Sequence, residues 1–366
     1  MRIDEITLRR LSLPLIRPYQ LSYRTFTEFE PIIVEVRDAD GRIGWGEGHI
    51  SPGSSTETRE GGWQFTLEHA AQIIGRDTNT AKTMLDAAVP ASKVAATALV
   101  TAIEMLEGNP LLEVEREAHL PLLTPFSSSH TVGEIENEVE ARLADGFRTF
   151  KIKVGKDADA DLRRVNTIQG AIDGRAKMRL DANRAYSERD ACKFAQSLTP
   201  KGIELFEQPC GAEDWEANAA VARQSPVPLM LDEPICEISD IERAAGIKGV
   251  GFCKLKLKRF GGLDRLKVAL ERVRKLGMEP VLGDGLSSEI GCWMEACVAH
   301  HTIHNAGEFN GFLKPAPRLF ENPLPFAQGT LSLPEHYIPR VDRAILAAHE
   351  IAKERFVRST MGTRSA

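Results

Sequence analysis

The first fifty residues alternate apolar and polar positions, a pattern typical of β-strands with one buried face. The run EITLRRLSLPL (residues 5–15) alternates in this way, and PIIVEVRDADGRIGWGEG (31–48) predicts two further strands. Asp40 and Gly41 lie between those two strands, where an Asp-Gly pair favours a hairpin turn. From about residue 63 the apolar positions recur with helical spacing, as in KVAATALVTAIEMLE. Strands followed by helices predict a small α+β domain over residues 1–118.

A different pattern begins at residue 119, where short apolar segments end in charged residues and are each followed by a helical segment. Parallel strands joined by helices repeat in this way, which predicts a β/α barrel over residues 119–328. An open, doubly wound sheet is the alternative, but the Gly-rich phosphate loop expected after its first strand is missing from the sequence. The strand-end charges recur every 24 to 28 residues, at Lys153, Asp181, Glu207, Asp232, Lys256, Asp284 and Glu308.

Composition excludes several classes of protein. Of the 366 residues, 46 are Lys or Arg and 52 are Asp or Glu, so no basic field suggests binding to nucleic acid or to an anionic membrane. No apolar run approaches the ~18 residues of a membrane span, and the N-terminus lacks the continuous apolar region of a signal peptide. The six cysteines form no C-x-x-C pair. We therefore expect a cytoplasmic protein with reduced thiols.

Three carboxylates, Asp181, Glu207 and Asp232, end three successive predicted strands. Taken singly, an Asp after a strand is more often a helix cap or a turn residue. In a barrel, however, the strand ends converge on one mouth, where three bare carboxylates would repel one another. A hard divalent cation removes that repulsion, and oxygen ligands at an open site favour Mg²⁺, or alternatively Mn²⁺. The lack of histidine at these strand ends argues against zinc.

Lysines lie on both sides of these carboxylates in the strand order. Strand alternation places Lys151 and Lys153 on one face, and Lys256 belongs to a strand beyond the carboxylates. Burial, a metal and neighbouring cations should lower a lysine's pKa and make its amine available as a base. A lysine could then remove the proton α to a carboxylate, with the cations stabilising the enediolate. Lys254 and Lys258 share a predicted face with Lys256, and spacing alone leaves open which of the three reaches the centre.

The motifs resemble those of the enolase superfamily, specifically its muconate-lactonizing-enzyme subgroup. TFKIKVG resembles the family's K-x-K strand, LDANRAY its D-x-N motif, FEQP and LDEP its next two metal-ligand motifs, and KLKRFGG its sixth-strand lysine. The resemblance covers nearly the whole chain. It implies a (β/α)₇β TIM-like barrel with an N-terminal α+β capping domain, followed by a C-terminal segment (329–366) that returns to the capping domain.

The resemblance also implies roles for individual residues. Asp181, Glu207 and Asp232 would bind Mg²⁺. Measured back from the Gly-Gly pair, the family's lysine falls on Lys256, which would form an acid/base pair with Lys153 on opposite faces of the substrate. Lys151 would support the enolate. Asn183 and Glu233 would support the metal ligands.

The sequence departs from the family pattern at two strands. At the eighth strand, dipeptide epimerases resemble D-x-D-G, an acidic pair that holds the substrate's ammonium, whereas this chain reads EFNG. Ser287 lies where the subgroup often has a glutamate, and the seventh strand lacks the histidine of the mandelate-racemase branch. We infer a substrate that can still carry a cationic nitrogen. The predicted substrate contacts are Glu308, Asn310, Asp284, Tyr23, Arg24 and His49.

These features predict an enzyme that acts on a small-molecule carboxylate, and we expect a homo-oligomer. The leading reaction is racemisation or epimerisation of an amino-acid-like substrate. A dehydratase of a hydroxylated amino or imino acid, such as a hydroxyproline, is the close alternative, and cycloisomerisation is the third. A Schiff-base aldolase would have little use for three carboxylates. A binding protein that has lost its activity is disfavoured by the full set of acids and lysines.

Overall fold

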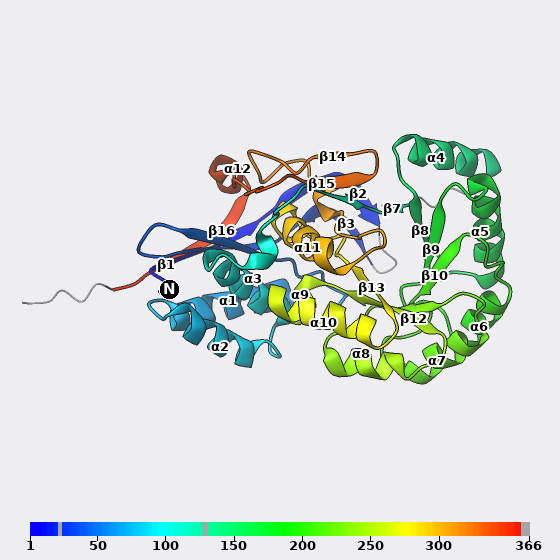
Figure 1. Ribbon diagram of the computed structural model, residues 1–366, viewed down its shortest axis with the longest axis horizontal. Coiled ribbons are helices and arrows are strands. Elements are labelled where there is room, and N and C mark those ends of the chain that lie inside the picture. Colours follow the sequence, from blue (N-terminus) through cyan, green and yellow to red (C-terminus); the bar gives the residue numbers. More distant parts are fainter. Residues whose placement is uncertain (21–23, 127–130, 360–366) are drawn as a thin grey trace, which may run out of the picture.

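The computed structural model describes residues 1–20, 24–126 and 131–359. A four-stranded antiparallel sheet lies at the N-terminal end of the molecule, in the order β16-β1-β4-β5 (Figure 1). Its outer strand β16 comes from the C-terminal part of the chain and pairs with β1, while β2 and β3 form a separate hairpin. The strands are β1 (Glu5–Leu11), β2 (Leu13–Gln20), β3 (Thr25–Phe29), β4 (Ile32–Arg37), β5 (Ile43–Gly48) and β16 (Glu350–Val357).

Three helices, α1 (Arg59–Ile73), α2 (Thr78–Ala88) and α3 (Lys93–Leu106), pack with this sheet. The central helix α3 is buried along nearly its whole length. It approaches β5 so closely that a Cβ atom added at Gly44 or Gly46 would lie 1.9 or 2.0 Å from a carbonyl oxygen of α3. The glycines of GWGEG therefore permit a helix-to-strand contact that no side chain would allow.

Seven parallel strands form the barrel sheet, in the order β13-β12-β11-β10-β9-β8-β7. An eighth, irregular segment closes the barrel. Its Gly307 N donates to Pro121 O and its Glu308 N donates to Leu282 O, both at 2.9 Å. The strands are β7 (Thr124–Pro125), β8 (Thr149–Lys153), β9 (Lys177–Asp181), β10 (Ile203–Glu207), β11 (Leu229–Leu231), β12 (Val250–Leu255) and β13 (Glu279–Leu282). This architecture agrees with the predicted α/β class and TIM-like barrel.

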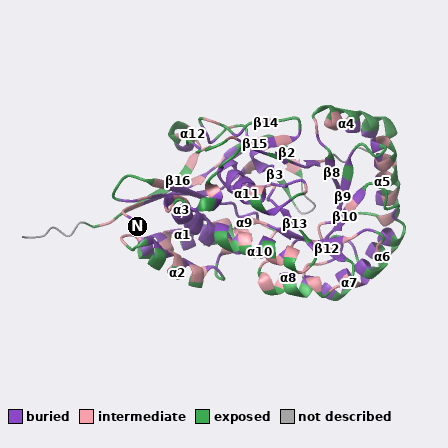
Figure 2. Cartoon of the chain, viewed as in Figure 1, coloured by how far each residue is buried: buried purple, intermediate pink, exposed green. Residues whose placement is uncertain are grey.

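Helices cover the outside of the barrel, most of them with an exposed outer face and a buried inner face, whereas α11 (Glu289–Thr302) is buried along nearly its whole length (Figure 2). Side chains that precede several of these helices cap their N-termini, as Asp157 caps α5 and Ser187 caps α6. The helices are α4 (Val132–Ala144), α5 (Ala158–Ile172), α6 (Glu188–Gln196), α7 (Trp215–Gln224), α8 (Ile238–Ala245), α9 (Leu257–Phe260), α10 (Leu263–Lys275) and α11 (Glu289–Thr302). Among the helices in the described ranges, none is long and apolar enough to cross a membrane.

The remaining elements connect the two parts of the chain. Strand β6 (Ala118–Pro121) pairs with β15 (Thr330–Leu333), which also pairs with β14 (Phe326–Ala327). Two short 3₁₀ turns, η1 (Pro110–Leu112) and η2 (Gly311–Leu313), and helix α12 (Arg343–Ala348) complete the fold. The small β6–β15 sheet joins segments on either side of the predicted domain boundaries, and those boundaries stay predictions.

One strand departs from the predicted pattern. Strand β12 ends at Leu255, and Lys256 is the N-cap residue of the short helix α9. The expectation that Lys254, Lys256 and Lys258 share one strand face is therefore wrong, because the chain turns into a helix between the first lysine and the third. The alternating sequence KLKLK predicts a longer strand, but the chain forms the short helix α9 between Lys256 and the Gly-Gly pair.

Candidate active site

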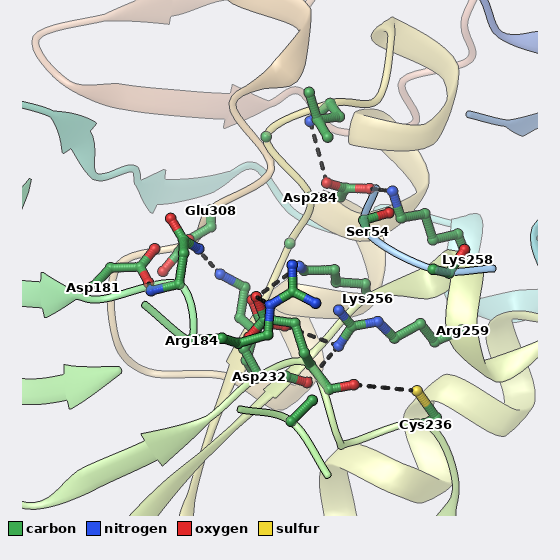
Figure 3. Close-up of a pocket in the computed structure, with 18 of the residues that line it drawn as sticks. Ser54, Asp181, Arg184, Asp232, Cys236, Lys256, Lys258, Arg259, Asp284 and Glu308 are labelled. Atoms are coloured by element: carbon green, nitrogen blue, oxygen red, sulfur yellow. Dashed lines mark hydrogen bonds and ion pairs between the residues drawn. The ribbon is translucent and has the colours of Figure 1, made fainter. Parts of the chain in front are cut away.

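A cavity of about 430 Å³ lies at the carboxyl ends of the barrel strands (Figure 3). Loops from most of the barrel line it, and residues 54–57 of the N-terminal domain contribute to its wall. A volume of this size suits a small molecule. Most of the predicted site residues line this cavity, namely Lys151, Lys153, Asp181, Asn183, Asp232, Glu233, Lys256, Asp284, Glu308 and Asn310.

Strand register brings the first two carboxylates together. In the β8–β9 pair Lys153 is opposite Asp181, and in the β9–β10 pair Asp181 is opposite Glu207. Asp232 follows the end of β11, and all three carboxylates are buried. The regular spacing of charges along the sequence therefore reflects one level of the barrel, at which the side chains of neighbouring strands meet.

Glu207 has the most unusual environment of the three. It is completely buried, and neither carboxylate oxygen accepts a hydrogen bond from the described residues, although Oε2 lies 2.6 Å from Lys151 Nζ. Burial and the negative charge of Asp181 raise the pKa of Glu207 to about 8. A buried acid with unused lone pairs is costly unless a cation is nearby.

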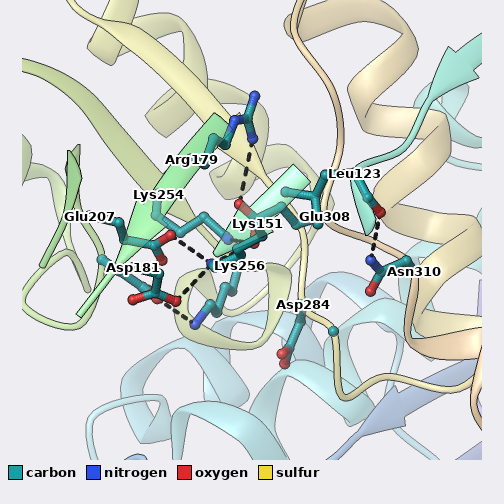
Figure 4. A network of polar contacts seen from close by, with 12 residues as sticks. Leu123, Lys151, Arg179, Asp181, Glu207, Lys254, Lys256, Asp284, Glu308 and Asn310 are labelled. Atoms are coloured by element: carbon teal, nitrogen blue, oxygen red, sulfur yellow. Dashed lines mark hydrogen bonds and ion pairs between the residues drawn. The ribbon is translucent and has the colours of Figure 1, made fainter. Parts of the chain in front are cut away.

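Lys151 lies among three carboxylates (Figure 4). Its Nζ is 3.0 Å from Asp181 Oδ2, 2.6 Å from Glu207 Oε2 and 2.9 Å from Glu308 Oε2. Burial lowers the pKa of Lys151, but the attraction of these carboxylates outweighs burial and holds the pKa well above its ordinary value. Lys151 is thus a fixed positive charge at the base of the cavity.

Lys153 projects from the end of the same strand toward different partners. Its Nζ lies 2.5 Å from Asp181 Oδ2 and donates to Asn183 Oδ1 at 2.6 Å. Asn183 has a positive φ of 44°, which allows its own backbone N–H to donate to Asp181 Oδ1 at 2.9 Å. Asn183 therefore orients both the carboxylate and the lysine.

Lys256 lies beyond the carboxylates in the strand order. Its Nζ donates to Asp232 Oδ2 at 3.0 Å, while Arg259 donates to Asp232 Oδ1 at 2.8 Å. Burial lowers the pKa of Lys256, but Asp232 and its acidic neighbours outweigh burial, so the pKa lies above its ordinary value. Burial lowers the pKa of both Lys151 and Lys256, as expected, but the surrounding carboxylates outweigh it at both lysines.

The other two lysines of KLKLK, Lys254 and Lys258, have different partners from Lys256. Lys254 is buried inside the barrel and forms an ion pair with Glu308. Lys258 lies on α9 and pairs with Asp284 at 2.5 Å. Each of the three lysines thus meets a different acid: Lys254 meets Glu308, Lys256 meets Asp232 and Lys258 meets Asp284.

The predicted substrate contacts fall into two groups. Glu308, Asn310 and Asp284 line the cavity. Tyr23 lies outside the described residues. Neither Arg24 nor His49 belongs to the cavity wall: Arg24 is exposed over the Phe26 ring, and His49 is buried with its ring centroid 5.0 Å from that of Phe29. The geometry gives no support for these last two as substrate contacts.

Sequence reasoning missed several cationic residues that shape the site. Arg259 holds Asp232, Arg184 pairs with Glu233 at 3.3 Å, and Arg179 reaches Glu308 from strand β9. A signal existed for Arg179, because alternation places it on the same face of its strand as Asp181. The partners of Arg184 and Arg259 depend on loop geometry, which the sequence pattern does not specify.

The donor set can be tested against a divalent cation. In the described ranges no three His, Cys, Asp or Glu side chains form a preformed metal cage, and lysine ammonium groups lie among the acids instead. Three buried carboxylates nevertheless meet at one level, and Glu207 keeps both oxygens free of hydrogen bonds from the described residues. An all-oxygen set with unused lone pairs fits a hard divalent cation. The side chains that fit are Asp181, Glu207 and Asp232.

Several curated proteins similar to this chain are isomerases. It is 31% identical to the L-Lys-D/L-Arg epimerase of Methylococcus capsulatus over 72% of this chain and 77% of that protein. It is 24% identical to the L-Ala-D/L-Glu epimerase of Bacillus subtilis, over 91% and 95% of the two chains. Muconate cycloisomerase 1 of Acinetobacter baylyi is 26% identical, over 89% and 90%.

Solved structures share the fold. The N-succinyl Arg/Lys racemase from Bacillus cereus superposes with a TM-score of 0.87 at 21% identity, covering 97% of this chain and all of that one. The muconate lactonizing enzyme from Pseudomonas fluorescens gives a TM-score of 0.86 at 23% identity, covering 95% and 99%. These similarities confirm the predicted barrel with its N-terminal α+β domain.

Family models match both parts of the chain. The model described as "Mandelate racemase / muconate lactonizing enzyme, N-terminal domain" matches residues 5–108, and "Enolase C-terminal domain-like" matches residues 134–337. Together with the epimerase and cycloisomerase relatives, these matches confirm the predicted class of enzyme, an isomerase of the enolase superfamily. The chain therefore belongs to the mandelate racemase/muconate lactonizing enzyme family of that superfamily.

Proposed function

We propose that this protein is a Mg²⁺-dependent racemase or epimerase that removes the proton α to the carboxylate of an amino-acid-like substrate. The observation that carries the proposal is the placement of Lys153 and Lys256. One ammonium is held at 2.5 Å by Asp181 and the other at 3.0 Å by Asp232, from strands on either side of the acids. Two proton carriers that approach a substrate from different sides suit removal of a proton from one face and its return to the other.

The family is metal-dependent, and Asp181, Glu207 and Asp232 would hold the ion. When bound, Mg²⁺ would supply positive charge that stabilises the substrate carboxylate as negative charge develops on it. Asn183 orients Asp181, and Glu233 lies next to Asp232, so these two residues would support the ligand set.

The lysines carry the proton steps in this proposal. A divalent cation held at Asp232 would offset the negative charge that raises the pKa of Lys256. The neutral amine of Lys153 or Lys256 then takes the α-proton, and the ammonium of the other returns a proton to the opposite face. The resulting enediolate carries two negative oxygens, and the fixed charge of Lys151 stabilises them. The cluster of carboxylates around Lys151 keeps that lysine protonated, which suits an electrostatic role.

The substrate class is supported by relatives. Epimerases named for L-Lys-D/L-Arg and L-Ala-D/L-Glu favour an amino-acid-like substrate. A second candidate is cycloisomerisation, because muconate and chloromuconate cycloisomerases are about as similar to this chain. Dehydration of a hydroxylated amino or imino acid is the remaining alternative. The predicted homo-oligomer and cytoplasmic location belong to the same proposal. Light scattering of the purified protein tests the oligomeric state.

The decisive experiment follows the α-proton directly. Amino-acid derivatives, hydroxyprolines and muconates would be incubated with the protein and Mg²⁺ in D₂O and followed by proton NMR and polarimetry. Deuterium at the α-carbon with loss of optical rotation supports racemisation. A 2-keto product would indicate dehydration, and conversion of the conjugated muconate diene to a lactone with one remaining C=C bond would indicate cycloisomerisation. No α-exchange with any substrate, although the protein binds Mg²⁺, would contradict the proposal.

A further inference from the structure

The proposed proton carrier Lys256 lies just beyond the barrel strands. It is the N-cap residue of α9, a single helical turn that connects β12 with α10. Gly261 ends that turn with a positive φ of 76°, and α10 begins two residues later, at Leu263. The position of Lys256 therefore depends on where this turn and the first residues of α10 lie.

A side chain of the N-terminal domain caps the start of α10. The N-cap residue of this helix, Gly262, has no side chain that could do so. The carboxylate of Glu104, on α3, takes its place. Its Oε2 accepts from Leu263 N at 2.8 Å and its Oε1 accepts from Asp264 N at 3.3 Å. Glu104 is only 4% exposed, so this buried carboxylate satisfies the first backbone donors of a barrel helix from another domain.

Two further contacts join the same turn of α10 to the N-terminal part of the chain. Asn109, which follows α3, donates from Nδ2 to Asp264 Oδ1 at 3.0 Å. Arg265 Nη2 lies 3.0 Å from Oδ1 of Asp86, on α2. Three consecutive residues, Leu263 to Arg265, are thus each in contact with α2, with α3 or with the segment directly after α3.

The Gly-Gly pair allows α3 to lie close to this segment (Figure 1). A Cβ atom added at Gly262 would lie 2.9 Å from Val100 Cγ1 and 3.0 Å from Glu104 Oε1. A side chain at this position would force α3 and its carboxylate away from α10. The contact between Glu104 and α10 is therefore part of a close-packed junction.

The other proposed carrier, Lys153, is held in a different way. It is the last residue of β8, which pairs with β7 and β9 in the barrel sheet. Asp181 and Asn183 hold its ammonium, and Arg164 donates to its backbone oxygen. These three partners belong to the barrel. A change in α3 should therefore displace Lys256 more than Lys153.

We infer that Glu104 is a positioning residue for the reaction, which fixes the start of α10 and, through α9, the ammonium of Lys256 beside Asp232. This inference rests on the proposed function. It gives the N-terminal domain a part in one of the two proton transfers, the one at the face that Lys256 serves. A reacting group that is displaced by about 1 Å can lose about a hundredfold in rate, so a weakened cap should slow that transfer.

Glu104→Gln tests the inference through the stereochemistry of exchange. The amide oxygen can accept from only one of the two backbone donors, and the NH₂ group faces the other. The probe is the amino-acid derivative that exchanges its α-proton fastest in the D₂O screen, and both of its α-carbon stereoisomers are measured with saturating Mg²⁺. The measurement is made at pH 8, because burial raises the pKa of Glu104 to about 7.

Lys256→Ala first identifies the stereoisomer whose exchange depends on Lys256. We expect Glu104→Gln to slow the exchange of that stereoisomer at least about tenfold and that of the other less than about twofold. Glu107→Gln is the matched control at the same end of α3, where the acid pairs with Lys82, and it should keep both rates.

A milder variant carries the test if Glu104→Gln does not fold. Asp264→Ala removes the contact with Asn109 from an exposed position and leaves the backbone donors to Glu104 in place. We expect a smaller loss, of at least about twofold, in the exchange of the same stereoisomer. Unchanged exchange in Asp264→Ala would then overturn the inference.

The outcomes separate the inference from the function on which it rests. Equal slowing of both stereoisomers in a folded Glu104→Gln protein would overturn the inference, because a general loss of structure or of the metal site affects both faces alike. Unchanged exchange in that variant would overturn it as well. Exchange of no candidate substrate by the unmodified protein would contradict the proposed function, and the inference with it.

Discussion

The carboxylate of Glu47, in the N-terminal domain, accepts hydrogen bonds from both the backbone N–H and the hydroxyl of Ser288, each at 2.6 Å. Gly291 N donates to the same carboxylate at 2.7 Å. Ser288 is the N-cap residue of α11, so a side chain from one domain satisfies the first backbone donors of a barrel helix.

Replacing this carboxylate should weaken the junction between the two domains. In Glu47→Gln the amide can accept on one side only, and its NH₂ group would face a backbone donor. We expect a loss of roughly 2 kcal/mol in the free energy of unfolding. We also expect a lower kcat/KM, because the loop before Ser288 lines the cavity. Urea unfolding measures the free energy of unfolding. Glu68→Gln, on the exposed face of α1, is the control and should change neither the free energy of unfolding nor kcat/KM.

The stereochemistry of the substrate should distinguish the roles of the two proposed proton carriers, Lys153 and Lys256. Lys153→Ala and Lys256→Ala should each abolish racemisation, with a loss of at least about a hundredfold. Each variant should retain α-deuterium exchange with only one of the two enantiomers, and the retained enantiomer should differ between them. NMR in D₂O measures this, with circular dichroism to confirm folding. Full activity in either variant would remove that lysine from the proposed mechanism.

Metal affinity should depend on the carboxylate that accepts no hydrogen bond from the described residues. Glu207→Gln replaces a charged ligand with a neutral one, and we expect Mg²⁺ binding measured by calorimetry to weaken at least about tenfold. Asp159→Asn, at an exposed acid on α5, is the matched control and should bind Mg²⁺ as the original protein does. Unchanged affinity in Glu207→Gln would place the ion elsewhere.

A buried acid on α11 predicts a pH dependence of stability. Glu295 accepts from Leu257 N and Asp284 N, both at 2.9 Å, and so ties together the ends of the sixth and seventh strands. Burial, assisted by the charge of Asp284, raises the pKa of Glu295 from 4.5 to about 7. Between these two values the folded protein binds the proton more tightly than the unfolded chain does. The contribution of Glu295 to stability is therefore complete below about pH 4.5 and declines as the pH rises toward 7, by roughly 3 kcal/mol.

Glu295→Gln should remove this part of the pH dependence. Urea unfolding between pH 5 and 8 should show a shallower decline in the free energy of unfolding for the variant. The exposed acid Glu271 provides the control, since Glu271→Gln should keep the original slope. Identical slopes for Glu295→Gln and the unmodified protein would contradict the assignment.

The glycines of β5 predict a packing cost. In Gly46→Ala the new Cβ would lie 2.0 Å from Ala98 O, a backbone atom that cannot move aside without shifting α3. We expect a loss of about 3 kcal/mol or failure to fold. Gly133→Ala, on α4, has no atom within 4 Å of the new Cβ and should be neutral or slightly stabilising. Thermal unfolding compares the two, and equal melting temperatures would contradict the packing argument.

Much of the site followed from the sequence because the barrel converts regular spacing into proximity. Lys153, Asp181 and Glu207 end neighbouring strands in register, so their spacing was sufficient to predict that they meet. The end of β12 was not predictable in the same way, because KLKLK alternates equally well as a strand. Only the turn into α9 gives Lys256 and Lys258 their directions.

Contacts between distant segments were also beyond the sequence pattern. Glu47 and Ser288 are 241 positions apart, and nothing in either local sequence indicates the other. Alternation places Arg179 on the same face of its strand as Asp181, but the acid that it meets depends on how the segment at Gly307 and Glu308 closes the barrel. Tertiary closure determines such pairs, and local periodicity carries no information about it.

The early end of β12 has a consequence for how this enzyme can diverge. One short peptide, KLKLK, delivers three ammonium groups to three separate acids through a strand, a cap and a helical turn. Because each lysine meets its own acid, the Lys254–Glu308 and Lys258–Asp284 pairs can be exchanged individually while Lys256 keeps its place beside Asp232. The charge pairs that surround the cavity and the proposed proton carrier are encoded within five consecutive residues, yet a substitution can change one without displacing the other.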